Sequence, residues 1–99
     1  MKTGEDPAAI LSDFLSRDAG AGSRQAHFLA HNGQIVQHTG ISCVPWSGHV
    51  SAANISVAGN MLVGPSVVQD TLASFLIYPE LPFAERLLTA MEAGQTAGG

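Results

Sequence analysis

Residues 57–65 have the sequence Val57-Ala58-Gly59-Asn60-Met61-Leu62-Val63-Gly64-Pro65. Around this segment, apolar side chains alternate with small or polar ones, which predicts a β-strand over residues 53–63 with one apolar face. Gly64-Pro65 ends the strand and begins a helix, because proline at the first helical turn has a preset φ and needs no N–H partner there. A strand that leads directly into a helix is therefore the centre of the expected fold.

Two helices are expected after this strand. The first begins at Pro65, and its spacing of apolar residues predicts a buried stripe of Val68, Leu72, Phe75 and Leu76. Residues 78–80, Tyr-Pro-Glu, end it. The second begins at Pro82, and its apolar residues at helical spacing are Ala84, Leu87, Leu88 and Met91. We expect Gly94, Gly98 and Gly99 to end that helix.

The segment before the strand begins with another helix and continues as a hairpin. Asp6 as N-cap and Pro7 at the first helical position predict a helix over residues 6–17. The small residues 19–23 form a connection. Strands over residues 25–31 and 34–39 flank Asn32-Gly33, a dipeptide typical of a type I′ turn. Residues 40–48 are expected to form a loop or a bent edge.

The order is therefore α-β-β-β-α-α in a single domain over residues 1–99. A helix pair that follows consecutive strands favours an α+β fold over a β-α-β crossover fold. The expected architecture is an antiparallel sheet with helices on one face.

Composition limits the partners of this chain. Only 12% of its 99 residues are charged, about half the usual share, while 45% are hydrophobic, and the mean hydropathy is +0.19. We therefore expect apolar surface that pairs with another copy or with a companion chain that completes the sheet. Four scattered Lys and Arg residues and a net charge of −4 argue against nucleic-acid binding.

The sequence predicts a cytoplasmic protein that does not bind membranes. The acidic start has no signal-peptide core, and no window has the eighteen or so apolar residues of a membrane-spanning helix. Cys43 is the single cysteine and cannot form an internal disulfide, which fits a reducing compartment.

The histidines do not form a metal-binding motif. His27 and His31, four apart on an expected strand, would lie about 13 Å from one another. His38, with His49 or Cys43, could assemble a zinc site, but no short ligand pair is present. We therefore expect no metal and no cofactor, and histidines that contact water or backbone.

The loop over residues 40–48 and His49 contain further candidates. Cys43 would need a nearby base such as His49 or His38 to act as a thiol nucleophile, and a lone cysteine beside Val44 and Pro45 is usually a small buried hydrophobe. Trp46 and His49 could line a pocket, with Trp46 as packing anchor being the alternative.

Asn60 is the most informative polar residue. It follows Gly59 inside the expected strand, and a glycine in a strand often marks a bulge or a close approach by a ligand or backbone. An amide held there could donate a hydrogen bond to a developing oxyanion. The alternative is that Asn60 binds an adjacent loop and shapes the bend.

Several short sequence motifs, taken together, resemble those of a bacterial family, domain of unknown function 1028. This family is placed in the N-terminal-nucleophile (Ntn) hydrolase superfamily. The motifs are Arg24-Gln25, Asn32-Gly33, His38-Thr39-Gly40, Cys43, Trp46-Ser47-Gly48-His49, Gly59-Asn60, residues 81–88 and residues 92–99. One departure is Ala30-His31, where an acidic residue followed by a small one is expected.

This resemblance implies a four-layer αββα sandwich and, in intact relatives, hydrolysis of an amide bond by a nucleophile at the start of a strand, with its own α-amino group as base. That segment is absent here, because Thr3 precedes a helix and not a strand. We therefore interpret the chain as part of an Ntn-hydrolase-like domain that is inactive alone.

For an assembled site, we expect Asn60 as oxyanion donor and His49 as a substrate or proton contact. Trp46, Thr39, His38 and Cys43 are the expected substrate-binding residues. The alternatives are a non-enzymatic interaction module that forms oligomers, and a truncated fragment without independent function.

Overall fold

The structure, a computed structural model, describes residues 6–99. In chain order, the described elements are α1 (Pro7–Arg17), a 3-10 turn η1 (Ala21–Ser23), β1 (Gln25–Leu29), β2 (Ile35–Thr39), β3 (Gly48–Ala52), β4 (Ile55–Gly59), α2 (Ser66–Ile77) and α3 (Phe83–Thr96).

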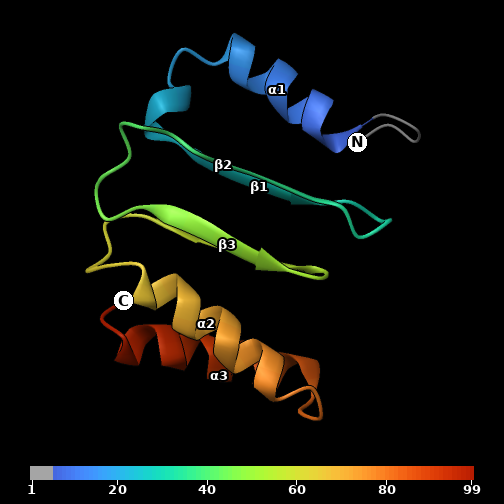
Figure 1. Cartoon of the computed structure of the whole chain (residues 1–99), viewed down its shortest axis with the longest axis vertical. Coiled ribbons are helices and arrows are strands. Elements are labelled where there is room, and N and C mark those ends of the chain that lie inside the picture. The colour runs from blue at the N-terminus through green and yellow to red at the C-terminus, as the bar shows by residue number, and fades with distance from the viewer. Residues whose placement is uncertain (1–5) are drawn as a thin grey trace.

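The strands form two antiparallel hairpins that lie face to face. β1 pairs with β2, and β3 pairs with β4, as two separate two-stranded sheets. β1 lies over β4, and β2 lies over β3. Helix α1 covers the outer side of the first hairpin, and α2 with α3 beside it covers the outer side of the second (Figure 1). The layers are therefore helix, sheet, sheet and helix.

The α+β class and the antiparallel pairing are confirmed, but the number of strands and sheets differs from the expectation. Of the residues 53–63 that were expected to form one strand, only the middle part, Ile55–Gly59, does so, as β4. The residues before them, Gly48–Ala52, form an additional strand, β3. The alternating pattern does not reveal the tight turn at Ala53-Asn54, where Asn54 adopts φ +62°. Asparagine tolerates this left-handed conformation better than most residues, so the turn needs no glycine.

The first hairpin is confirmed, while its predicted type I′ turn is wrong. Gly33 N–H donates to Ala30 O at 2.9 Å, and Ala30 N–H donates to Gln34 O at 2.8 Å. Only Gly33 has positive φ, at +88°. The loop is thus a three-residue connection with glycine in the left-handed position. His31 lies in this loop and not on β1, so it does not share a strand face with His27.

The N-terminal helix begins as predicted. The Asp6 carboxylate accepts a hydrogen bond from Ala8 N–H at 3.1 Å, and the helix ends at Arg17 with Asp18 as C-cap. The predicted connection over residues 19–23 contains the short turn η1, whose backbone carbonyls at Ala21 and Gly22 lie against Gly40 just after β2.

The C-terminal helices form where expected, but of the four residues in the predicted stripe of α2 only Val68 is buried. Val67, Val68, Thr71 and Ser74 are the buried residues of α2, and Ala90 and Gly94 are those of α3. A Cβ on Gly94 would collide with Thr71 Oγ1, so the two helices are in close contact through small side chains. Gly94 therefore lies inside α3 and does not end it.

The apolar stripe of α3 faces outward. Leu88 and Met91 are 60% and 66% exposed, and Leu76 on α2 is 46% exposed. Helical spacing correctly groups these residues on one face, but it cannot say whether that face is covered. In the described part of the molecule, it is not.

Candidate functional site between the two hairpins

The layer between the two hairpins is polar. Two stacked sheets normally interdigitate apolar side chains, whereas here amides, hydroxyls and imidazoles meet. The residues that form hydrogen bonds across this layer are Gln25, His27, Gln37 and Thr39 of the first hairpin, and His49, Ser56 and Asn60 of the second. Such a layer contributes less hydrophobic stabilisation than an apolar one, which makes it a candidate functional site.

Gln25, the first residue of β1, connects the two hairpins. Its Nε2 donates to Gly59 O at 2.9 Å and to Gly48 O at 3.0 Å, and it lies 3.0 Å from Thr39 Oγ1. Because a carbonyl oxygen can only accept, these contacts fix which end of the amide carries nitrogen. The Gln25 Oε1 atom therefore faces Asn60.

Asn60 follows β4 and is held by this amide. Its Nδ2 donates to Gln25 Oε1 at 3.1 Å. The second Nδ2–H has no partner among the described residues, and the side chain is exposed. The next residue, Met61, adopts φ +58°, which is rare for a residue with an unbranched side chain and indicates local backbone strain. An oriented amide with one free N–H is what an oxyanion donor requires.

His49 lies on β3, diagonal to Asn60 on the same face of the second hairpin. Its Nδ1 lies 2.8 Å from Thr39 Oγ1. Gln25 Nε2 has no lone pair with which to accept, so the Thr39 hydroxyl proton is free to point at His49 Nδ1. In the neutral tautomer in which Nδ1 accepts from Thr39, the proton lies on Nε2, on the far side of the ring from Thr39. His49 is exposed and can therefore donate to a bound molecule.

The structure thus brings three of the sequence-predicted residues, Asn60, His49 and Thr39, into one hydrogen-bonded network with Gln25. Gln25 was not among the residues predicted from the sequence to belong to a site. A signal was present, because polar residues alternate at positions 25 and 27 and at 37 and 39, so each strand has a polar face where a two-sheet core would be apolar.

Trp46 lies at the edge of this network. Its backbone exchanges hydrogen bonds with Leu62, at 3.0 and 3.1 Å. The indole ring packs against Gly48, where an added Cβ would lie 2.6 Å from the ring. Trp46 therefore fixes the backbone of Gly48, whose carbonyl accepts from Gln25. Its role in substrate binding stays a prediction.

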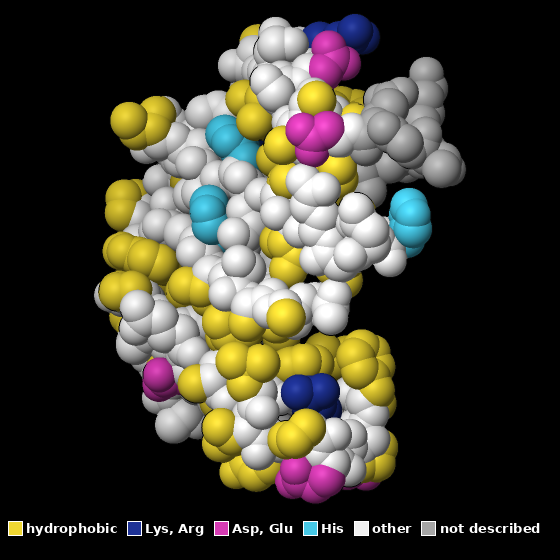
Figure 2. Space-filling model, turned by 45° about the vertical axis from the view of Figure 1, so that its right-hand side comes forward, with side chains coloured by type: hydrophobic (Ala, Val, Ile, Leu, Met, Phe, Trp, Pro, Cys, Tyr) yellow, Lys and Arg dark blue, Asp and Glu magenta, His cyan; other side chains and the backbone are white. Residues whose placement is uncertain are grey.

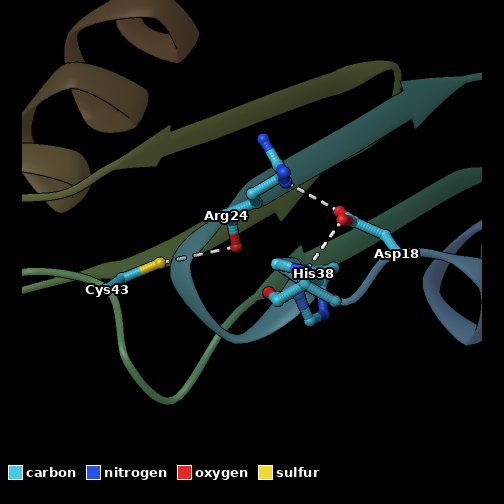
Figure 3. A network of polar contacts seen from close by, with 6 residues as sticks. Asp18, Arg24, His38 and Cys43 are labelled. Carbon is cyan, nitrogen blue, oxygen red and sulfur yellow. Dashed lines mark hydrogen bonds and ion pairs between the residues drawn. The ribbon is translucent and has the colours of Figure 1, made fainter.

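His38 and Cys43 lie elsewhere. His38 projects from the opposite face of β2, toward α1, and its Nε2 donates to Ala21 O at 2.8 Å. Cys43 is buried, and its thiol donates to Arg24 O at 3.4 Å. Figure 3 shows both beside the Asp18–Arg24 ion pair. The first hairpin thus separates His38 from Asn60 and His49, whereas Cys43 lies in the loop between the hairpins and points its thiol toward the start of β1.

The Asp18 carboxylate in that second network is a stabilised anion. Gly20 N–H donates to it at 2.9 Å, and Arg24 Nε lies 2.7 Å from its other oxygen. These two contacts, with the backbone hydrogen bond as the larger cause, hold the pKa of Asp18 below its ordinary value of 3.8. The network fastens the connection after α1 to the start of β1.

A second cluster lies further along the strands, where Ser56 of β4 meets His27 of β1. Ser56 Oγ is 2.6 Å from His27 Nδ1 and accepts a hydrogen bond from Gln37 Nε2 at 2.8 Å. Gln37 Nε2 also donates to Val50 O at 2.9 Å, which fixes the orientation of this amide. None of these residues was selected from the sequence as a site residue.

Across residues 6–99, no group of three or more His, Cys, Asp or Glu side chains could hold a metal ion. None of the described helices has the length and apolar character needed to cross a membrane. Thr3, to which no nucleophile role was transferred, lies outside the described residues.

Comparison with known proteins identifies the family. A model of the family of unknown function DUF1028 matches residues 1–99. The chain belongs to the DUF1028 family. No curated protein matches this DUF1028 chain at a significant level. The predicted resemblance is confirmed at the level of the family, while placement in the Ntn superfamily stays a prediction.

One solved structure extends the comparison. The DUF1028 chain is similar to protein SPO2555 from Silicibacter pomeroyi, whose crystal structure is described as a DUF1028 protein. The two share 31% sequence identity with a TM-score of 0.88, and the match covers 97% of this chain. The chain spans 42% of that relative's length.

Proposed function

We propose that residues 1–99 form one wall of the active site of an amide-bond hydrolase, and that the rest of the site, including the nucleophile, comes from a further segment or chain. The observation that carries this proposal is the network in which Gln25 orients Asn60 while Thr39 orients His49. The helix, sheet, sheet, helix order is compatible with the Ntn-like sandwich that the family resemblance implies.

In this proposal, Asn60 and His49 act on different parts of the reaction. When a nucleophile attacks the amide carbonyl, negative charge develops on its oxygen, and the free Nδ2–H of Asn60 donates to that oxyanion. A single donor of this kind contributes about 3 kcal/mol to transition-state stabilisation. His49, whose Nε2 faces outward, contacts the substrate or transfers a proton to the leaving amine.

The test uses the Silicibacter pomeroyi relative, because the proposal places the nucleophile outside residues 1–99. Amine release from a panel of acyl and aminoacyl amides is measured, and the side chains that superpose on Asn60 and His49 are replaced by Ala one at a time. Each replacement should lower kcat by about two orders of magnitude. The matched control replaces the side chain that superposes on Asn32, in the hairpin loop, and should leave kcat unchanged.

Two results would contradict the proposal. One is an unchanged kcat in the Asn60-equivalent variant. The other is efficient amide turnover by the 99-residue chain alone, because the nucleophile would then lie within it.

A second candidate function is a non-enzymatic interaction module that self-associates. The observation that favours it is the uncovered apolar face of α3, where Phe83, Leu88 and Met91 are 70%, 60% and 66% exposed. Figure 2 shows hydrophobic side chains gathered around the hollow between the strands and the C-terminal helices. A soluble monomer seldom exposes so much clustered apolar surface.

A further inference from the structure

The Ser56 cluster has the geometry of an activated hydroxyl. Ser56 Oγ lies 2.6 Å from His27 Nδ1, within the range expected of a nucleophile and its base. Gln37 Nε2 donates to the same oxygen at 2.8 Å. An amide nitrogen can only donate, so the Ser56 proton is not directed at Gln37 and is available for His27 Nδ1. His27 is therefore placed to accept that proton.

Two cavities adjoin this hydroxyl. One has a volume of about 310 Å³ and the other of about 230 Å³, and both are lined by His27, Ser56, Ile55, Phe75 and Leu87. Apart from the serine–histidine pair, the shared lining is apolar. An apolar cavity with a few convergent polar groups is the usual form of a small-molecule site. This lining suits the acyl chain of an ester better than a charged ligand.

We propose that Ser56 is a nucleophile for acyl transfer, with His27 as its general base and Gln37 as the positioning residue. This site is separate from the Asn60 network and does not depend on the amide-hydrolase proposal. Its substrate class is the ester of a short or medium-length aliphatic acid and a good leaving group.

The reaction is balanced by groups on the chain and by water. Ser56 Oγ forms a bond to the ester carbonyl carbon while its proton moves to His27 Nδ1. The bond from carbon to the leaving oxygen then breaks, and the leaving group takes that proton. Water hydrolyses the acyl-serine, with His27 again as base, and releases the carboxylic acid. Gln37 Nε2–H keeps the serine oxygen beside the cavities throughout.

The experiment uses the full 99-residue chain and p-nitrophenyl hexanoate as the probe. After a brief reaction, the chain is digested and the acylated residues are located by mass spectrometry. The neighbouring Ser51 is the internal control, because it pairs with Ser56 across β3 and β4 and its side chain forms no hydrogen bond among the described residues. Ser56 should be acylated at least tenfold faster than Ser51, and faster with the hexanoyl than with the acetyl ester.

Matched variants separate the roles of the two residues. Ser56→Ala and His27→Ala should each reduce p-nitrophenol release at least tenfold, whereas Ser51→Ala and His31→Ala should not change it. Far-UV circular dichroism and melting check that each variant is folded. Ser56→Ala with full activity would mean that His27 or another group reacts directly, and the proposal would be wrong.

Acylation of the unmodified chain tests the proposal even if a variant fails to fold. Equal acylation of Ser56 and Ser51 in the folded chain overturns the proposal without reference to any substitution. Failure of this experiment leaves the Asn60 proposal untouched, because that proposal is tested on amides with the longer relative.

Discussion

At the residue scale, Gln25 links the two hairpins through a single side chain. Its amide reaches two backbone carbonyls, one hydroxyl and the Asn60 side chain. The layer between the hairpins has few apolar contacts, so these hydrogen bonds determine how the hairpins are aligned. Removing the amide leaves partly buried carbonyls without donors, which costs more than a hydrogen bond between exposed groups.

Replacing Gln25 by Ala should therefore lower the free energy of unfolding by about 2–3 kcal/mol. Urea unfolding followed by circular dichroism measures the change. The control is Gln69→Ala, at an exposed position on α2, which should change stability by less than about 0.5 kcal/mol. Equal effects in the two variants would show that the Gln25 network contributes little.

The Asp18 carboxylate is stabilised by two local contacts that lower its pKa. Because Gly20 N–H and Arg24 favour the carboxylate, the folded-state pKa lies below 3.8. The stabilisation is thus fully present above the unfolded-state pKa and is lost as pH falls through the folded-state value. Arg24→Gln should raise the pKa of Asp18 toward 3.8 without reaching it, since the Gly20 contact remains. Carboxyl carbon NMR titration measures this, and an unchanged pKa would contradict it.

At the scale of the elements, α2 and α3 contact one another through small residues. Gly94 faces Thr71, whose hydroxyl donates to Val67 O at 2.7 Å. Their approach explains why the larger residues Leu88 and Met91 remain outside the contact. The close approach of the two helices thus depends on the absence of a Cβ at position 94.

Gly94→Ala should lower the free energy of unfolding by about 1–2 kcal/mol, although alanine favours a helix by about 1 kcal/mol over glycine. Thr71→Ala removes the colliding hydroxyl, so the double variant should be less destabilised than the sum of the two single variants, by about 1 kcal/mol. Chemical unfolding of all three measures this coupling. Gly64→Ala is the control, because a Cβ there would meet nothing within 4 Å. Strict additivity would exclude the proposed collision.

The sequence predicts those elements whose signals are local. Local signals located α1 by Asp6 and Pro7, the first hairpin by Asn32-Gly33, and α2 by Pro65, because each depends on contacts within a few residues. The second hairpin was missed because Ala53-Asn54 is not a strong turn sequence. Asn60 and His49 were selected from their positions in the sequence. The hydrogen bond between Asn60 and Gln25 joins residues 35 positions apart, so no local sequence pattern indicates it.

In the molecule as a whole, the helices cover the outer faces of the two hairpins to different extents. Helix α2, with α3 packed beside it, covers the second hairpin, while α1 alone covers the first and leaves an apolar cavity of about 530 Å³ beside Leu11, Phe14 and Phe28. Each strand is paired on one side only within its two-stranded sheet. Together with the 42% coverage of the solved relative, this arrangement supports the proposal that further strands and helices complete both layers.

Because the apolar face of α3 is uncovered, the 99-residue chain should self-associate through this face. Light scattering coupled to size-exclusion chromatography should give a mass above 10.2 kDa that rises with concentration, together with a cooperative thermal melt. Charges placed in the apolar stripe by Leu88→Glu and Met91→Glu should shift the chain toward the monomer, because burying an unpaired carboxylate is costly. Glu85→Gln, at an exposed position on the same helix, is the control. A cooperative melt of a strict monomer would exclude the α3 face as an interface, whereas a non-cooperative melt would indicate that the chain requires the remaining layers in order to fold.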